Sequence, residues 1–204
     1  MDNIGKPERA TQNRVIQLFR DELNYRYLGD WHERENNSNI EETLLSEYLT
    51  RNGYNTAQIS GAIKKLKDAA SQHSQNLYNK NKAVYSLLRY GAAIKTSVSE
   101  NTETIHFIDW KNPQANDFAI AEEVTLKGEN TRRPDLVLYV NGIAIGVIEL
   151  KNSRVSIGDG IRQNSQINAP NLTSGFSQRC NLSLQAMTAK VCVTGQSAHK
   201  KSIF

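Results

Sequence analysis

The sequence predicts an α/β (α+β) fold in which a mixed sheet is flanked by helices, with a helical region at the N-terminus. Two observations indicate this class. Apolar residues recur at helical spacing through residues 1–92, for example in the run from Leu44 to Leu49. After Gly91 the pattern changes to short β-branched runs separated by turn residues, which is typical of strands.

Four helices are expected in the N-terminal part. The first is opened by Thr11, the second is capped by Asn39 and the third is opened by Thr56, because Ser, Thr, Asp and Asn favour the position before a helix. The fourth is expected from about residue 82 to residue 90, where Gly91 ends it.

Strands of a mostly antiparallel sheet follow, over residues 93–98, 104–109 and 118–126. The clearest signal is a hairpin whose strands, 135–140 and 143–150, flank Asn141-Gly142, a dipeptide typical of a type I′ turn. The second of these strands is apolar at nearly every position, so we expect a central strand covered on both faces. One more short helix is expected near Gly160.

Composition limits the kind of protein. The chain has 204 residues and a formal net charge of +4, which allows a polyanionic partner without requiring one. No run of eighteen apolar residues occurs, so no membrane span is expected. The first residues lack the apolar core of a signal peptide, and we therefore expect a cytoplasmic protein.

Charged side chains gather at one end of the predicted hairpin. Glu149 and Lys151 alternate at the end of the apolar strand, and Asp135 opens its partner. Two carboxylates suit a hard cation such as Mg²⁺, which would activate a water for phosphodiester hydrolysis while a lysine steadies the developing charge. The alternative is an exposed strand end with no chemistry, and spacing alone leaves both open.

The geometry of this site depends on the register of the hairpin. A strict two-residue turn pairs Asp135 with Ile148, so that Asp135 and Glu149 point to opposite faces of the sheet. The site forms only if the ladder is irregular. Pro134 cannot donate a ladder hydrogen bond, so a bulge is expected there, at the open end of the hairpin.

These residues resemble a known family. Pro134-Asp135 followed by Glu149-Leu150-Lys151 resembles the PD-(D/E)xK nuclease signature. With the runs 133–139 and 146–151, the chain resembles the N-terminal nuclease domain of type I restriction enzyme R subunits. Further segments agree, and the resemblance covers roughly residues 11–164; these segments are 27–31, 36–40, 87–91, 108–110, 116–125 and 160–164.

The resemblance implies a restriction-endonuclease-like core and a set of site residues. Asp135, Glu149 and the Leu150 carbonyl would bind Mg²⁺, with Mn²⁺ as a possible substitute, and Lys151 would be the catalytic lysine. Gln163 would contact phosphate or a base.

Other residues are weaker candidates. Glu22 is a candidate for an additional acidic residue, although its apolar neighbours favour a surface role. Lys64, Lys65 and Lys67 are candidates for contacts to DNA phosphates, although a solvated helix face is the more common role for such a run.

The chain departs from the family after Asn164. Residues 165–204 are rich in Ser, Gln, Asn and Thr without a clear period. A back-translation exists whose neighbouring frame reads as the family's continuation, which suggests a one-base frameshift; a divergent native tail is the alternative. The expected organisation is a helical part over 1–92 and a sheet core over 93–164, together one domain, followed by a poorly packed out-of-frame tail.

The resemblance implies a Mg²⁺-dependent DNA endonuclease domain of a type I restriction-modification system, whose partners are DNA and the methylation and specificity subunits. No Gly-x-x-x-x-Gly-Lys-Ser/Thr loop occurs, so neither ATP binding nor a translocase is expected in this chain. Two alternatives remain open: an inactive remnant that at most binds DNA, and an independent repair or junction nuclease.

Overall fold

The computed structural model describes residues 5–71, 76–96, 101–125 and 131–150. Helices and strands are interspersed along the chain, and the first strand follows directly after the first helix and its π-helical turn. The elements are α1 (Gly5–Gln17) with a π-helical turn at Leu18–Glu22, β1 (Arg26–Asp30), α2 (Glu42–Arg51), α3 (Thr56–Ser71), α4 (Leu77–Tyr90), β2 (Ala92–Ile94), β3 (Glu103–Ile105), a 3-10 turn at Pro113–Ala115, β4 (Phe118–Glu122), β5 (Leu136–Val140) and β6 (Ile143–Ile148).

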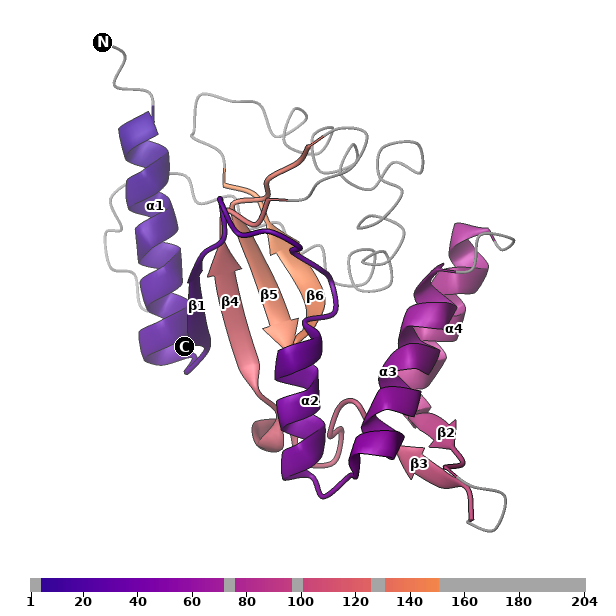
Figure 1. The fold of residues 1–204 in the computed structure, drawn as a ribbon. Helices are drawn as coiled ribbons and strands as arrows, with labels where there is room; N and C mark the ends of the chain where they lie inside the picture. Colours follow the sequence, from indigo (N-terminus) through magenta and orange to yellow (C-terminus); the bar gives the residue numbers. More distant parts are fainter. Residues whose placement is uncertain (1–4, 72–75, 97–100, 126–130, 151–204) are drawn as a thin grey trace, which may run out of the picture.

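The main sheet has the strand order β1-β4-β5-β6, and β2 and β3 form a separate antiparallel pair (Figure 1). β1 runs parallel to β4, whereas β4–β5 and β5–β6 are antiparallel. The sheet is therefore mixed, and the predicted fold class is confirmed. Within the part of the chain described, no helix combines the length and apolar character needed to cross a bilayer.

Strand direction brings four strand ends to one edge of the sheet. β1, β4 and β6 end there, and β5 begins there (Figure 1). We call this edge, which carries Asp30, Glu122, Asp135 and Glu149, the site edge. Each of the four strands has an acidic residue at this end: Asp30 and Glu122 are the last residues of β1 and β4, Asp135 directly precedes β5, and Glu149 directly follows β6.

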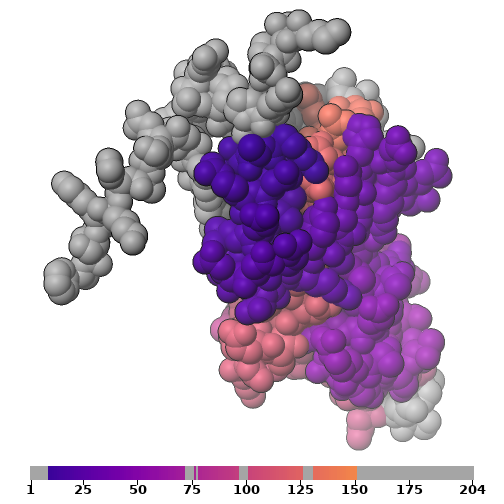
Figure 2. Space-filling view, turned by 90° about the vertical axis from the view of Figure 1, so that its left-hand side faces the viewer, coloured from indigo at the N-terminus to yellow at the C-terminus, as the bar shows by residue number. Residues whose placement is uncertain are grey.

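α1 packs on one face of the sheet. Ile16 belongs to a buried cluster with alternate residues of β4, β5 and β6, and the helix forms the upper, indigo part of the face seen in Figure 2. The cluster's other buried members are Ile120, Leu136, Ile148 and Leu150. The opposite face carries a second cluster around Trp31 and Tyr139, whose rings lie 5.6 Å apart.

The other end of the hairpin packs against the helical part. Val140 and Ile143 belong to the largest core cluster together with α2, α3, α4 and the β2–β3 pair. Asn141 and Gly142 have φ of 51° and 80°, as a type I′ turn requires, so the predicted turn is confirmed. The backbone carbonyl of Gly142 accepts a hydrogen bond from the Glu41 N–H at 2.8 Å, directly before α2.

Several predicted details are wrong. β1 lies inside the region 1–92, for which the sequence predicts only helices. Thr11 lies within α1 and does not open it. Asn39 does not cap α2; Glu41 precedes the helix, and the Asn39 carbonyl instead accepts a hydrogen bond from the Ala144 N–H.

Two further differences concern lengths and positions. α4 begins five residues earlier than predicted, because the Asn76 side chain accepts a hydrogen bond from the Asn79 N–H at 2.9 Å and caps it. β6, expected to be central, stands last in the described strand order, although most of its residues are buried. The predicted helix near Gly160 and the tail 165–204 lie outside the described residues.

Candidate active site

The β5–β6 hairpin contains a bulge that changes the faces of its residues. Val140 pairs with Ile143 and Tyr139 with Ala144, but Leu138 pairs with Gly146, so Ile145 is the extra residue. The bulge therefore lies within β6 and not at Pro134, where it was predicted.

The consequence appears at the site edge. Leu136 pairs with Ile148, and continuing the ladder by one residue sets Asp135 opposite Glu149. Directly opposed residues of an antiparallel pair share a face and stand about 4.5–5.5 Å apart at their Cα atoms. The irregularity that the candidate site needs is present, at a different residue.

Asp135 is held by both its side chain and its backbone. Its Oδ2 accepts a hydrogen bond from the Leu150 N–H at 2.6 Å, which ties the start of β5 to the chain just beyond β6. Its carbonyl accepts from the Glu123 N–H at 2.9 Å and from Gln12 Nε2 at 3.4 Å. Asp135 and Glu149 are half-buried, and Leu150 is buried.

A second set of contacts, which shares Gln12 with the first, surrounds Glu122. This residue is 3% exposed and accepts hydrogen bonds at Oε2 from Arg9 Nη1 at 2.6 Å and from Gln12 Nε2 at 2.9 Å. The Tyr27 hydroxyl donates to Oε1. A buried carboxylate needs such partners, and α1 supplies two of them.

The Glu122 contacts shift the pKa values of their donors. The hydrogen bond to Glu122 raises the pKa of Arg9 above its ordinary value. Desolvation, and then the bond to Glu122, raise the pKa of Tyr27 to about 12. Both donors therefore keep their protons throughout the neutral range.

Basic side chains border the same edge. Arg133 Nε lies 2.9 Å from Glu123 Oε2, and its guanidinium also contacts the His32 ring. The Arg133 side chain remains 46% exposed. An exposed cation two residues before Asp135 is suitably placed for an anionic ligand at this edge.

The predicted site residues divide into three groups. Asp135 and Leu150 are joined by the hydrogen bond from the Leu150 N–H, and Glu149 lies beside them, directly after β6, at the site edge. Lys151 and Gln163 lie outside the described residues, so their roles stay predictions. Glu22 is exposed at the end of the π-helical turn.

The lysines of α3 are engaged to different degrees. Lys67 Nζ pairs with Glu42 Oε1 at 2.6 Å, Lys65 Nζ donates to the Ala93 carbonyl at 3.2 Å, and Lys64 is exposed. Their contact with DNA stays a prediction.

Among the described residues, no group of three or more His, Cys, Asp and Glu side chains is arranged to hold a metal ion. The three predicted ligands, Asp135, Glu149 and the Leu150 carbonyl, would offer two carboxylates and one carbonyl. Mg²⁺ often uses one or two carboxylates and keeps several waters.

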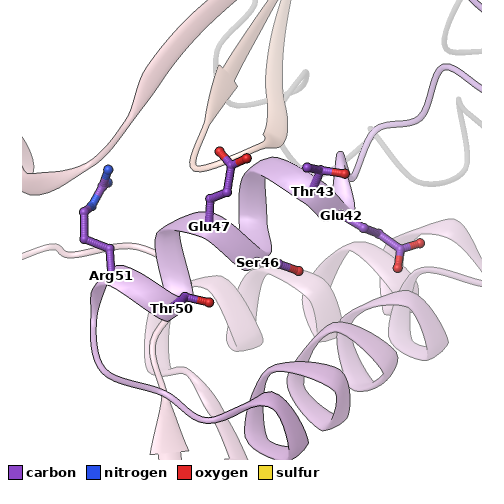
Figure 3. Close-up of a pocket in the computed structure, with 6 residues that line it drawn as sticks. All are labelled: Glu42, Thr43, Ser46, Glu47, Thr50 and Arg51. Atoms are coloured by element: carbon purple, nitrogen blue, oxygen red, sulfur yellow. The ribbon is translucent and has the colours of Figure 1, made fainter.

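A shallow hollow lies along α2 and takes no residue from the site edge (Figure 3). It is lined by Glu42, Thr43, Ser46, Glu47, Thr50 and Arg51. All six side chains come from one helix, and no second element among the described residues contributes to the lining.

Comparison with known proteins gives the family. Residues 6–177 match the family described as the N terminus of type I restriction enzyme R proteins. The chain belongs to this family. A type I restriction R-protein N-terminal domain is consistent with a restriction endonuclease role, and the resemblance noted in the sequence is confirmed.

One curated relative supports the assignment. The chain is 27% identical over 159 residues to a Methanocaldococcus jannaschii protein named as the endonuclease subunit of a type I restriction enzyme, MjaIXP. The aligned part covers 71% of this chain and 15% of that protein. The R-protein domain described here therefore spans a small part of the relative's length.

Sequence reasoning missed Glu122, Arg9 and Gln12. A signal for Glu122 existed, because Glu122 and Glu123 follow the apolar run Phe118–Ala121, and an acidic residue at the end of a buried strand calls for a partner. Nothing in the sequence indicates that its partners come from a helix more than a hundred residues earlier.

Proposed function

We propose that this R-protein domain is a Mg²⁺-dependent DNA endonuclease that hydrolyses phosphodiester bonds within a type I restriction-modification system. The observation that carries the proposal is the Ile145 bulge, because in the shifted register Asp135 and Glu149 are the residues next to the last pair, Leu136 and Ile148. Without that extra residue the two acids would face away from each other, and no shared cation site would exist.

Each residue has a distinct role in this proposal. Asp135, Glu149 and the Leu150 carbonyl hold the cation, and the Leu150 N–H fixes the orientation of the Asp135 carboxylate. Lys151 contacts the attacking water or the phosphate, because a protonated lysine cannot be a metal ligand. The bound cation supplies charge neutralisation at the phosphate and acidifies its water.

The partners follow from the family. DNA is the substrate, and the methylation and specificity subunits are expected to select it in the complete system. Arg133 and Gln163 are candidates to contact the DNA near the cleaved bond. The chain carries no phosphate-binding loop for ATP, so its cleavage reaction is expected to need no nucleotide.

Plasmid cleavage by the purified chain tests the proposal. Supercoiled plasmid is incubated with the protein and Mg²⁺ or Mn²⁺, and nicked and linear products are measured. Asp135→Asn and Glu149→Gln should each abolish cleavage. Glu42→Gln is the matched control, because it removes one carboxylate that is 56% exposed and lies outside the site edge.

Metal binding supplies a second measurement. Asp135→Asn should weaken Mn²⁺ binding measured by calorimetry at least about tenfold, since even residues that only orient metal ligands typically contribute that much. Lys151→Ala should bind Mn²⁺ as the wild type does and cut about 10²–10³-fold more slowly. Absence of cleavage at high Mn²⁺, or unchanged cleavage by Asp135→Asn, would overturn the proposal.

A further inference from the structure

The outer side of α4 carries an unusual stripe of residues. Tyr78, Lys82, Tyr85 and Arg89 follow one another at intervals of four, three and four, which places all four on one side of the helix. All four are exposed, and Tyr78 and Tyr85 are 72% and 51% exposed. We call this set the α4 stripe.

The exposed aromatic rings of the stripe do not contribute to the hydrophobic core. The core of this region is formed from other residues, because Val84 on another side of α4 is buried in the helical cluster. Two exposed tyrosines spaced seven residues apart on one helix face present flat rings to an outside partner.

Along the stretch of sequence that contains the stripe, the charged residues have one sign. Between Asp68 and Glu100 the sequence contains no acidic residue, and its cations are Lys80, Lys82, Arg89 and Lys95. Those four positive charges equal the formal net charge of the entire chain, +4. Since Lys80 is 5% exposed, the cations that a partner meets along the stripe itself are Lys82 and Arg89.

A third aromatic ring extends the stripe at its C-terminal end. Trp110 is 49% exposed, and its Nε1–H donates to the Leu88 carbonyl at 2.9 Å. The Arg89 guanidinium lies 5.4 Å from the centre of the indole ring. The indole is thus fixed in place beside Arg89 while much of its surface stays open.

One acidic group borders this end of the stripe. Asp109 lines the same hollow as Trp110 and Arg89, and its Oδ1 accepts hydrogen bonds from the N–H groups of Lys111 and Asn112, both at 2.9 Å. The exposed cations Arg89 and Lys111 line the hollow as well, two positive charges against this negative one. The balance of charge around Trp110 therefore favours an anion.

We propose that the α4 stripe, together with Trp110, binds single-stranded DNA. Alternating exposed aromatic rings and cations are the chemistry with which proteins hold an unpaired strand, since bases stack on the rings and phosphates meet the cations. The stripe from Tyr78 to Arg89 extends for about 17 Å along the helix. The choice of DNA as the polyanion rests on the proposed nuclease function; the surface itself lies on a different element from the site edge.

Binding is measured without cleavage. The full chain is titrated in EDTA against a fluorescently labelled fifteen-base oligothymidine, with anisotropy and tryptophan fluorescence as readouts. Trp110 is the exposed indole and Trp31 is 8% exposed, so binding should quench tryptophan emission, and Trp110→Phe should remove most of the quenching.

Matched variants isolate the stripe. Tyr78→Ala with Tyr85→Ala should weaken binding by about tenfold or more, because each stacked base typically contributes that order of affinity. Tyr90→Ala is the control, since Tyr90 is 68% exposed on the same helix but lies off the stripe. Lys82→Gln with Arg89→Gln should reduce the slope of log affinity against log salt by about 1.4.

The outcomes separate this inference from the nuclease proposal. Equal binding by wild type and the double tyrosine variant, or an equal loss in Tyr90→Ala, would overturn it. So would self-association of the chain, seen by sedimentation, in place of oligonucleotide binding. Asp135→Asn should bind the oligonucleotide normally, and a chain that binds in this way but never cuts would leave the inference standing while the nuclease proposal fails.

Discussion

The close approach of the hairpin turn to α2 makes Gly142→Ala a sharp test of the fold that carries the candidate site. An added Cβ at Gly142 would stand 2.8 Å from the Glu41 carbonyl oxygen, the Leu44 Cβ and the Leu45 nitrogen. Two of these atoms are backbone and the third is attached directly to it, so no flexible side chain can move aside. We expect Gly142→Ala to destabilise the protein strongly.

The magnitude has two parts. Gly142 has φ of 80°, a left-handed conformation that costs an L-residue about 1–2 kcal/mol. Overpacking against a fixed neighbour adds about 1–3 kcal/mol. The total is about 3 kcal/mol, which corresponds to a fall in melting temperature of about 6–12 °C for a domain of this size.

Gly53→Ala is the matched control. Gly53 also has a left-handed φ, 86°, but an added Cβ there meets no atom within 4 Å. It should therefore show only the backbone part, about 1–2 kcal/mol. Thermal and urea unfolding of both variants measure the difference, and equal destabilisation by the two substitutions would refute the close packing of the turn on α2.

Three further predictions concern polar side chains that make defined hydrogen bonds. Glu122→Ala should lower the free energy of unfolding, measured by urea titration, by about 2–3 kcal/mol, because the buried Gln12 amide loses an acceptor. Glu122→Gln should lower it less, and equal losses in the two variants would contradict this account. Because folding raises the pKa of Tyr27 to about 12, its contribution to stability is complete below pH 10 and is lost as pH rises toward 12. The stability gap between wild type and Tyr27→Phe should narrow across that window, and a constant gap would contradict it. Asn141→Gly keeps the turn conformation but loses the 2.8 Å hydrogen bond to the Phe107 carbonyl. Asn141→Ala loses the same bond and also places a residue with a Cβ at a positive φ, which alanine disfavours. Melting temperatures should therefore fall in the order wild type, Asn141→Gly, Asn141→Ala.

The sequence was informative where local chemistry decides structure. Asn141-Gly142 specifies the hairpin because both positions need positive φ, and the flanking runs could be assigned as strands from their β-branched residues. Gly91 marks the end of α4 for the same conformational reason, with φ of 84°. These signals act within a few residues and need no knowledge of the rest of the fold.

The sequence was uninformative where distant contacts decide structure. β1 has largely exposed residues and no period of two, and it pairs in parallel with β4 about ninety residues later. Just before it, the rings of Tyr25 and Phe19 pack edge to face with their centres 4.9 Å apart. β1 stands first in the strand order, and an edge strand with largely exposed residues leaves little hydrophobic pattern.

The Ile145 bulge illustrates a different limit. The run from Ile143 to Ile148 is apolar throughout, so moving the register by one residue exchanges one apolar side chain for another, and the pattern cannot distinguish the two registers. The resemblance supplied the pairing of Asp135 with Glu149 as an expectation, and the bulge provides its geometric basis.

The alternation of side chains between the two faces of a strand separates two kinds of carboxylate at the site edge. Glu122 pairs in register with Leu136, whose face of the sheet is covered by α1, and it is met there by Arg9 and Gln12. Asp135 is one residue before Leu136, and the alternation of side chains along a strand sets it on the face opposite to that of Glu122. Glu122 thus anchors the helix to the sheet, and the proposed cation site uses the pair of acids on the other face. A single extra residue in β6 is what brings Glu149 to the second group, since without it Glu149 would lie on the helix-covered face with Glu122.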